Sequence, residues 1–314
     1  MQLISCYEIG IHHNIRATVI RYSAFFLWKT SSPAPTFRGA LYDWYLATNG
    51  GFWGVRAGLA GGRPVKLILN VRDWTVHVIN AMTIDISPSS VEYSAFSLEG
   101  VLLASGKFST PAQIDGNTVS HLGDSLPWVG ERNMSIPTVV LYRLDLSYVQ
   151  HDDRGITSSV KNCYYLTDPS TRGGGKAHSR FASLGDMRKD NLRVDLDVRC
   201  TMSHGIECAI QNGHADLVAV MIKLSLLQLG KDRDSHILPT LFSDNYLTLL
   251  PGEITHLHLS AEEDNIMPDC STIIVNVDGW NIRKKSVQVS CDSVVLADRF
   301  MEQNVTQFGL GSLA

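Results

Sequence analysis

The chain has 314 residues, of which 44% are hydrophobic and 18% are charged, so it can bury a sizeable core and is not disordered throughout. Its formal net charge of −4 offers no basic surface for a nucleic acid. No apolar run reaches the roughly 18–20 residues of a membrane span, and the longest candidate is interrupted by Lys223 and Ser225. We therefore expect a globular protein with neither a nucleic acid nor a membrane as partner.

The first block, residues 1–57, has the pattern of a single strand followed by a single helix. Residues 23–28 form a short continuous apolar run, which is typical of a strand covered on both faces. Residues 41–46 have the pattern of a short helix, which Asn49 and the two glycines after it should end. Such a unit cannot make a domain alone. We expect it to be only partly buried, and we expect deletion of residues 1–57 to improve solubility.

Residues 58–168 alternate apolar and polar side chains, as half-buried antiparallel strands do. Leu67 and Leu69 alternate with their neighbours, and a longer alternation later in the block contains Val140, Tyr142, Leu144 and Leu146. Glu99-Gly100 separates two such runs, residues 91–98 and 101–108, and predicts a tight hairpin. Six or seven short strands are expected here, which favours a β-sandwich.

Residues 169–189 are rich in glycine and serine and indicate a linker. Residues 190–291 alternate again and predict a second sandwich, in which residues 217–227 form a strand rather than a helix. Residues 292–314 are expected to be a tail.

Two residue pairs in the last block are candidates for covalent or metal chemistry. Cys200 and Cys208 flank a predicted hairpin, where they either form a disulfide or remain two buried thiols. His256 and His258 are two apart on a predicted strand and share one face. No third ligand has a suitable spacing, which favours solvated histidines over a metal site. The pattern therefore assigns no residue to a metal.

Three stretches of the sequence, the family stretches, together resemble one enzyme family. The first contains Leu27-Trp-Lys-Thr30, Phe37-Arg-Gly-Ala-Leu-Tyr-Asp-Trp-Tyr-Leu46 and Gly51-Phe-Trp-Gly-Val-Arg56, the second is Asn162-Cys-Tyr-Tyr-Leu-Thr-Asp168, and the third contains Ile237-Leu-Pro-Thr-Leu-Phe-Ser-Asp-Asn-Tyr246, Leu249-Leu-Pro-Gly-Glu253 and Val277-Asp-Gly-Trp-Asn281. In order and spacing they are similar to glycoside hydrolase family 2, specifically to exo-β-D-glucosaminidases and mannosylglycoprotein endo-β-mannosidases.

The resemblance implies a fold and a position within the longer enzyme. In that family a sugar-binding sandwich and a second sandwich precede a (β/α)₈ barrel, and two more sandwiches follow the barrel. This chain would then be mainly β. Two immunoglobulin-like β-sandwiches, residues 58–168 and 190–291, would be joined by the linker 169–189. A remnant of the barrel, its last strand and helix, would occupy residues 1–57, and the tail 292–314 would follow.

The resemblance also implies a chemistry, that of a retaining hydrolase with two glutamates, one of them preceded by asparagine. The sequence contains no Asn-Glu dipeptide, and a complete barrel takes about 250 residues. We therefore assign no catalytic residue to this chain and expect no hydrolysis from it alone.

The substrate of the intact enzyme would be a β-linked mannoside or glucosaminide glycan, and no cofactor is implied. Trp28 and Lys29 are the expected substrate-binding residues. They would stand at the C-terminal end of the last barrel strand, the face on which barrel enzymes place their substrates.

A different interpretation is a free-standing, non-catalytic sandwich that binds carbohydrate or protein. Trp128 or Trp280 would then offer a platform for a sugar ring, unless these residues belong to the core or to a corner of the sandwich. The sequence does not indicate a compartment. The N-terminus lacks the pattern of a signal peptide, whereas Asn133-Met-Ser135 and Asn304-Val-Thr306 are compatible with secretion.

Overall fold

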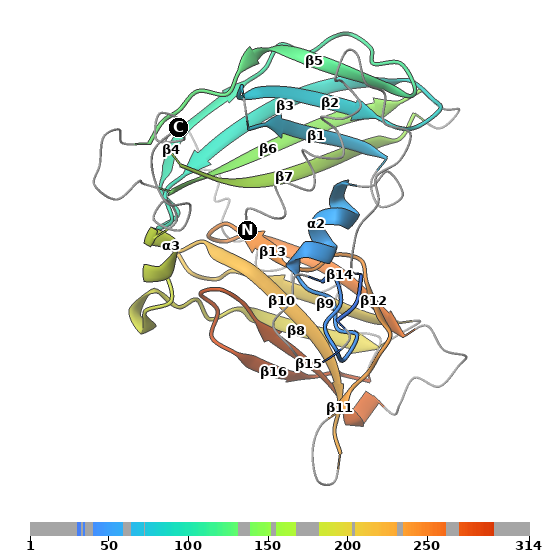
Figure 1. The fold of residues 1–314 in the computed structure, drawn as a ribbon, viewed down its shortest axis with the longest axis vertical. Coiled ribbons are helices and arrows are strands. Elements are labelled where there is room, and N and C mark those ends of the chain that lie inside the picture. The colour runs from blue at the N-terminus through green and yellow to red at the C-terminus, as the bar shows by residue number, and fades with distance from the viewer. Residues whose placement is uncertain are drawn as a thin grey trace, which may run out of the picture. The chain divides into compact units, whose positions relative to one another are not determined.

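The structure is a computed structural model that describes residues 30–32, 34, 40–58, 64–71, 73–130, 139–151, 155–167, 182–202, 205–230, 235–261 and 270–291. The chain divides into two compact units, Met1–Leu192 and Arg193–Ala314 (Figure 1). Both are built from antiparallel sheets, so the prediction of a mainly β chain with immunoglobulin-like sandwiches is confirmed. No described helix is long and apolar enough to cross a membrane. The expected strand at residues 23–28 lies outside the described residues.

The first unit contains two sheets. A three-stranded sheet has the order β1-β2-β5, formed by β1 (Val65–Asn70), β2 (Thr75–Asn80) and β5 (Thr118–Ser125). A four-stranded sheet has the order β4-β3-β6-β7, formed by β4 (Leu102–Lys107), β3 (Ile86–Phe96), β6 (Val139–Gln150) and β7 (Thr157–Thr167). The predicted hairpin is confirmed: β3 pairs with β4, and the turn between them places Gly100 at a φ of 81°.

The core of the first unit lies between these two sheets. Its members come from both, and include Leu67, Leu69, Val76, Val78, Val140, Tyr142, Leu144 and Leu146. The alternation predicted for β6 is therefore confirmed. On β1 the expected alternation is incomplete, because Lys66 and Ile68 are also buried. The ammonium nitrogen of Lys66 is buried together with the stem.

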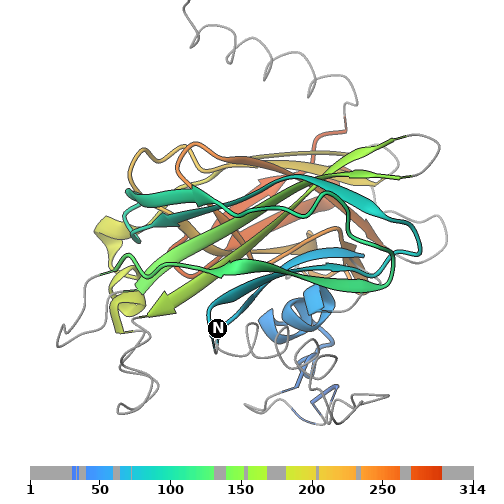
Figure 2. The same cartoon turned by 90° about the horizontal axis from the view of Figure 1, so that it is seen from above.

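The helix expected at residues 41–46 is wrong, and the helix of this segment begins after it. Helix α2 (Gly50–Gly58) starts where Asn49 Oδ1 accepts hydrogen bonds from the backbone N–H groups of Gly51 and Phe52, at 2.9 and 3.2 Å. Asparagine at this position is a favourable N-cap. Figures 1 and 2 draw α2 as a short blue helix, which precedes β1 in the chain.

Residues 43–47 instead form a turn organised by one carboxylate. Asp43 Oδ1 accepts hydrogen bonds from the N–H groups of Tyr45 and Ala47 at 2.8 and 2.9 Å, and Leu46 has a φ of 64°. Local bonding of this kind competes with a helix. The turn leaves Trp44 48% and Tyr45 67% exposed.

Because these two aromatic rings expose apolar surface, we expect the double substitution Trp44→Ser and Tyr45→Ser to raise the protein concentration at which aggregation begins. Stability should change little. The matched control is Trp53→Ser in α2, whose side chain is buried and whose loss should lower the melting temperature instead. Light scattering and thermal denaturation measure the two effects. Equal solubility of the double variant and the parent would contradict the expectation.

The segment expected to be a linker contains a short helix. Residues 168–181 lie outside the described part, but α3 (Ala182–Asp186) and η3 (Asp190–Leu192) follow them. Leu184 and Met187 are buried, so this end of the segment is packed rather than free. The domain boundaries expected from the sequence stay predictions.

The second unit also contains two sheets. One has the order β12-β14-β9-β8, formed by β12 (Thr240–Phe242), β14 (Ile254–Ala261), β9 (Ile206–Gln211) and β8 (Asp197–Met202). The other has the order β11-β10-β15-β16, with β13 also paired to β10; it is formed by β11 (Ser235–His236), β10 (Ala219–Gln228), β15 (Ile273–Asp278), β16 (Lys285–Gln288) and β13 (Leu247–Leu249). A short helix, η4 (Cys270–Thr272), precedes β15.

The strand predicted at residues 217–227 is confirmed as β10. Its residues Val220, Ile222, Leu224 and Leu226 are buried in the core, as is Val218 directly before it. Its pairing with β13 shifts register between Ala219 and Ile222, and Met221 in this interval has a φ of 53°. Strand β10 is therefore bulged at this point, which its alternation does not predict.

Candidate functional site

Both residues expected to bind substrate, Trp28 and Lys29, lie outside the described residues. The described remainder of the first family stretch packs on itself. The rings of Tyr42 and Phe52 are 5.3 Å apart, the Arg56 guanidinium lies 4.8 Å from the centre of the Trp53 ring, and Trp53 Nε1 donates to Thr48 Oγ1 at 3.2 Å. These aromatic residues therefore contribute to the packing of α2.

The second family stretch joins the two sheets of the first unit. Asn162 Nδ2 on β7 donates to the backbone oxygen of Leu67 at 3.2 Å and to the Tyr164 hydroxyl at 2.8 Å. The same hydroxyl accepts the backbone N–H of Leu69 at 3.1 Å. Leu67 and Leu69 lie on β1, an edge strand of the other sheet. Asn162 and Tyr164 thus satisfy backbone groups that the edge of a sheet would leave unpaired.

The third family stretch holds the bulged strand β10 through two buried asparagines. Asn281 Oδ1 accepts the N–H of Val220 at 2.9 Å, and its Nδ2 donates to the Val218 oxygen at 2.8 Å. Asn245 does the same farther along, accepting from the N–H of Leu224 at 2.9 Å and donating to its oxygen at 3.0 Å. Each side-chain amide therefore takes the place of a partner strand along one edge of β10.

The two tryptophans considered as sugar platforms are half-buried rather than exposed. Trp128 packs edge-on against Trp74, with ring centres 5.8 Å apart, and is 6.4 Å from the Tyr142 ring. It is thus a corner residue against the core of the first unit. The backbone N–H of Trp280 donates to the Val220 oxygen at 3.0 Å, so Trp280 stands beside the bulge of β10.

Tyr142 is the buried residue against which Trp128 packs. Its hydroxyl donates to the Pro127 oxygen at 2.7 Å and accepts the N–H of Val129 at 3.0 Å. Burial raises the pKa of Tyr142 to about 12, against the lowering effect of the Val129 hydrogen bond.

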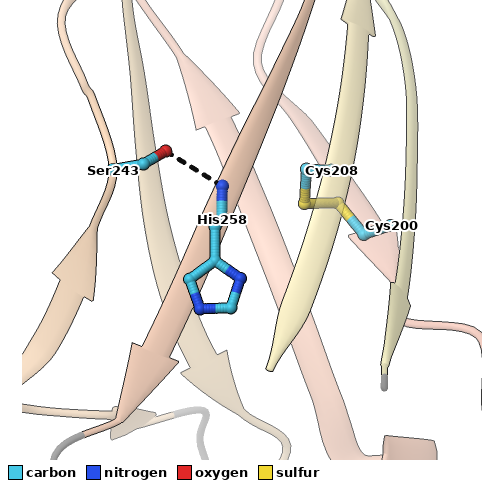
Figure 3. Close-up of a disulfide and its surroundings, with 4 residues drawn as sticks. All are labelled: Cys200, Cys208, Ser243 and His258. Atoms are coloured by element: carbon cyan, nitrogen blue, oxygen red, sulfur yellow. Dashed lines mark hydrogen bonds between the residues drawn. A yellow bond between two sulfur atoms is a disulfide. The ribbon is translucent and has the colours of Figure 1, made fainter. Parts of the chain in front are cut away.

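The question left open for Cys200 and Cys208 is answered by a disulfide. The two cysteines are directly paired across β8 and β9, with Cα atoms 4.2 Å apart (Figure 3). A second disulfide joins Cys270 to Cys291. Spacing alone does not indicate it, because its partners stand on segments that meet only in the folded unit.

The histidines of β14 point outward, as expected. Leu257 is buried and His258 is exposed, with its ring Nδ1 2.7 Å from Glu207 Oε1 on β9. Ser243 Oγ accepts the backbone N–H of His258 at 2.9 Å, and the ring points away from it (Figure 3). Ser243 and His258 are therefore not arranged as a nucleophile and its base. Among the described residues, no three side chains are placed to hold a metal ion.

One polar cluster was not found by sequence reasoning. Thr75 Oγ1 donates to Asp73 Oδ1 at 2.6 Å and lies 2.8 Å from His77 Nε2, and the ring of His77 is 4.9 Å from that of His121. Burial raises the pKa of Asp73, but the hydrogen bonds from Thr75 and the charge of His77 outweigh it and leave the pKa below its usual value. The cluster closes the turn before β2.

Comparison with known proteins agrees with the expected family. Residues 173–282 match the exo-β-D-glucosaminidase Ig-fold domain family. The mannosylglycoprotein endo-β-mannosidase of Lilium longiflorum is 23% identical over 86% of this chain and 32% of its own length. An exo-β-D-glucosaminidase of Arthroderma benhamiae is 24% identical over 83% of this chain and 28% of its own length.

The fold has a solved counterpart. The exo-chitosanase CsxA of Amycolatopsis orientalis superposes with a TM-score of 0.66 at 17% identity, covering 91% of this chain and 33% of that one. The chain thus spans about a third of the length of the relatives it matches. The resemblance predicted from the three stretches is confirmed: this chain is similar, over most of its length, to the C-terminal part of glycoside hydrolase family 2 enzymes of the exo-β-D-glucosaminidase and endo-β-mannosidase type.

Proposed function

We propose that this chain is the C-terminal β-sandwich part of a retaining glycoside hydrolase that acts on β-mannosides or β-glucosaminides. The observation that carries the proposal is the match of residues 173–282 to the exo-β-D-glucosaminidase Ig-fold domain, together with relatives of both specificities along most of the chain. In this proposal the two sandwiches support a barrel that carries the chemistry.

The roles of the family stretches agree with a supporting function. Asn162 and Tyr164 join two sheets, and Asn245 and Asn281 hold the bulged strand β10. None of these four side chains is arranged to act as an acid, a base or a nucleophile, because each is hydrogen-bonded to a backbone group. We propose Trp28 and Lys29 as the residues that would line the sugar site of the complete enzyme, and we propose no cofactor.

We also propose that the 314-residue chain alone does not hydrolyse glycosides. The family mechanism needs two carboxylic acids on opposite sides of the scissile bond, and the Asn-Glu dipeptide that marks one of them does not occur in this sequence. Three of the described acidic side chains make local contacts: Glu253 accepts the N–H of Leu250 in a turn, Glu207 pairs with His258, and Asp145 pairs with Arg143.

Chromogenic β-mannosides and β-glucosaminides test this directly. We expect the purified chain to release no more chromophore than the same preparation after heat denaturation. The matched control is the Asn281→Ala variant, purified identically. A contaminating hydrolase would give the same turnover in both preparations. Turnover that rises with the amount of the parent chain and is absent from the variant would contradict the proposal.

The gene can test whether the chain is part of a longer hydrolase. Sequencing the transcript and the genomic region upstream should find a continuous reading frame that encodes the earlier barrel strands and both glutamates. A transcript that begins at this Met1 behind a functional promoter would favour the free-standing module instead. A glycan array probed with the chain would then decide whether that module binds carbohydrate.

A further inference from the structure

A short segment closes the second unit by crossing from one sheet to the other. After β16, the backbone N–H of Val289 donates to the Ile273 oxygen at 3.1 Å, on the sheet of β15. The next residue, Ser290, pairs with β8 of the other sheet. Its N–H donates to the Cys200 oxygen at 2.9 Å, and its oxygen accepts the N–H of Met202 at 2.9 Å. We call residues 289–291 the seam.

Both disulfides of the second unit touch the seam. Cys291 is its last residue and is bonded to Cys270 in η4, directly before β15. Cys200 supplies the carbonyl that Ser290 bonds, and its own disulfide to Cys208 ties β8 to β9. One disulfide therefore fastens the end of the seam, and the other fastens the strand that receives it.

The two disulfides differ in how easily a reductant can reach them. Cys200 and Cys208 are 3% and 1% exposed, inside the core of the unit. Cys291 is exposed and Cys270 is half-buried. Thiol–disulfide exchange requires a thiolate to approach a sulfur along the S–S axis, so access decides which bond exchanges first. Reaching the Cys200–Cys208 bond requires the unit to open, whereas Cys291 is an exposed residue from which the second bond can be attacked.

We propose that Cys270–Cys291 is a redox-modification site that a dithiol reduces selectively, and that its reduction loosens the seam while the Cys200–Cys208 bond stays closed. One thiolate of the dithiol attacks the Cys291 sulfur. The S–S bond breaks, and the Cys270 sulfur leaves with the electron pair and takes a proton from solvent. The second thiol then attacks the mixed disulfide, which leaves Cys291 reduced and the dithiol oxidised to its cyclic disulfide.

The structural consequence is local. Once Cys291 is released, the seam keeps its backbone bonds to β8 and β15 but loses the covalent anchor at its end. The hydrogen bonds of Ser290 should therefore open more often, and the two sheets should separate more easily along β8 and β16. The N–H of Leu224 on β10, which donates to Asn245, makes no contact with the seam and should be unaffected.

The test uses the full oxidised chain. Thiols that react before reduction, with Cys163 as the candidate among the described cysteines, are first blocked with N-ethylmaleimide. The folded chain is then exposed to dithiothreitol for increasing times, new thiols are labelled with iodoacetamide, and the labelled peptides are quantified by mass spectrometry. We expect Cys270 and Cys291 to be labelled at least tenfold faster than Cys200 and Cys208. Equal rates, the reverse order, or maleimide on Cys270 and Cys291 before reduction would overturn the proposal.

Hydrogen exchange tests the loosening. After selective reduction, the amides of Ser290 and Met202 should exchange at least tenfold faster, while that of Leu224 stays unchanged. A Cys270→Ser, Cys291→Ser double variant should show the faster exchange without reductant and no further change with it, and Cys163→Ser should behave as the parent. If the double variant does not fold, the reduced parent chain decides. An unchanged Ser290 amide, or equal acceleration at Leu224, would refute the local role.

Discussion

Replacing Asn281 by alanine is expected to lower the free energy of unfolding of the second unit by about 3 kcal/mol. The side-chain amide bonds the Val220 N–H and the Val218 oxygen, and all three residues are fully buried. Alanine would leave that donor and that acceptor without the amide and without water. Each buried polar group left unpaired costs about 1–3 kcal/mol. The loss should be larger than for most single substitutions.

The measurement has to separate the two units, because a chain of two units need not unfold in one step. Urea denaturation followed by hydrogen exchange of peptides from residues 193–291 reports the second unit alone. Asn276→Ala is the matched control: Asn276 lies on the neighbouring strand β15, where its side chain accepts a surface hydrogen bond from Ser286. It should cost less than about 0.5 kcal/mol. Equal losses for the two variants would show that Asn281 does not hold β10 as described.

The strands could be predicted from the sequence because apolar and polar side chains alternate along them, so that one face is apolar and the other polar. The alternation on β6 and the outward histidines of β14 needed no knowledge of the partner strands. The turn at Gly100 was equally local, since a glycine there adopts a positive φ without a steric penalty.

The first helix was misplaced because two side chains redirected the backbone. The pattern of residues 41–46 suits a helix, but Asp43 bonds the N–H groups of Tyr45 and Ala47 and stops it from forming. Asn49, expected to end a helix, caps the start of the next one. Asparagine before glycine is compatible with either end. The local pattern therefore does not choose between them.

The contacts of the family stretches could not be derived because they join distant segments. Asn281 reaches Val220 across 61 residues, and Asn162 reaches Leu67 across 95. A single sequence shows no such pairing, and the same holds for Cys270 and Cys291. The proposed sugar-binding residues Trp28 and Lys29 came from resemblance alone, without a physical pattern in the chain to support them.

The first unit is expected to lose stability at alkaline pH because of Tyr142. Its hydroxyl is buried between Pro127 and Val129, and burial raises its pKa to about 12. In the unfolded chain a tyrosine ionises near pH 10. The fold therefore favours the neutral form. The associated stability, about 2.7 kcal/mol for two pKa units at 1.36 kcal/mol each, is fully present below the unfolded pKa of about 10. Most of it is lost as the pH rises to 12.

Tyr142→Phe should separate this effect from the ionisation of the other tyrosines. At pH 8 we expect the variant to be less stable than the parent by about 1–3 kcal/mol, because the Pro127 oxygen and the Val129 N–H lose a buried partner. The gap between the two should then narrow by about 2 kcal/mol between pH 10 and pH 12, since the substituted side chain has no proton to lose. Urea denaturation followed by tryptophan fluorescence, to which Trp74 and Trp128 beside Tyr142 contribute, measures both. Tyr45→Phe, at an exposed position, is the control. A gap that stays constant with pH would mean that the Tyr142 hydroxyl is already solvated in the folded unit.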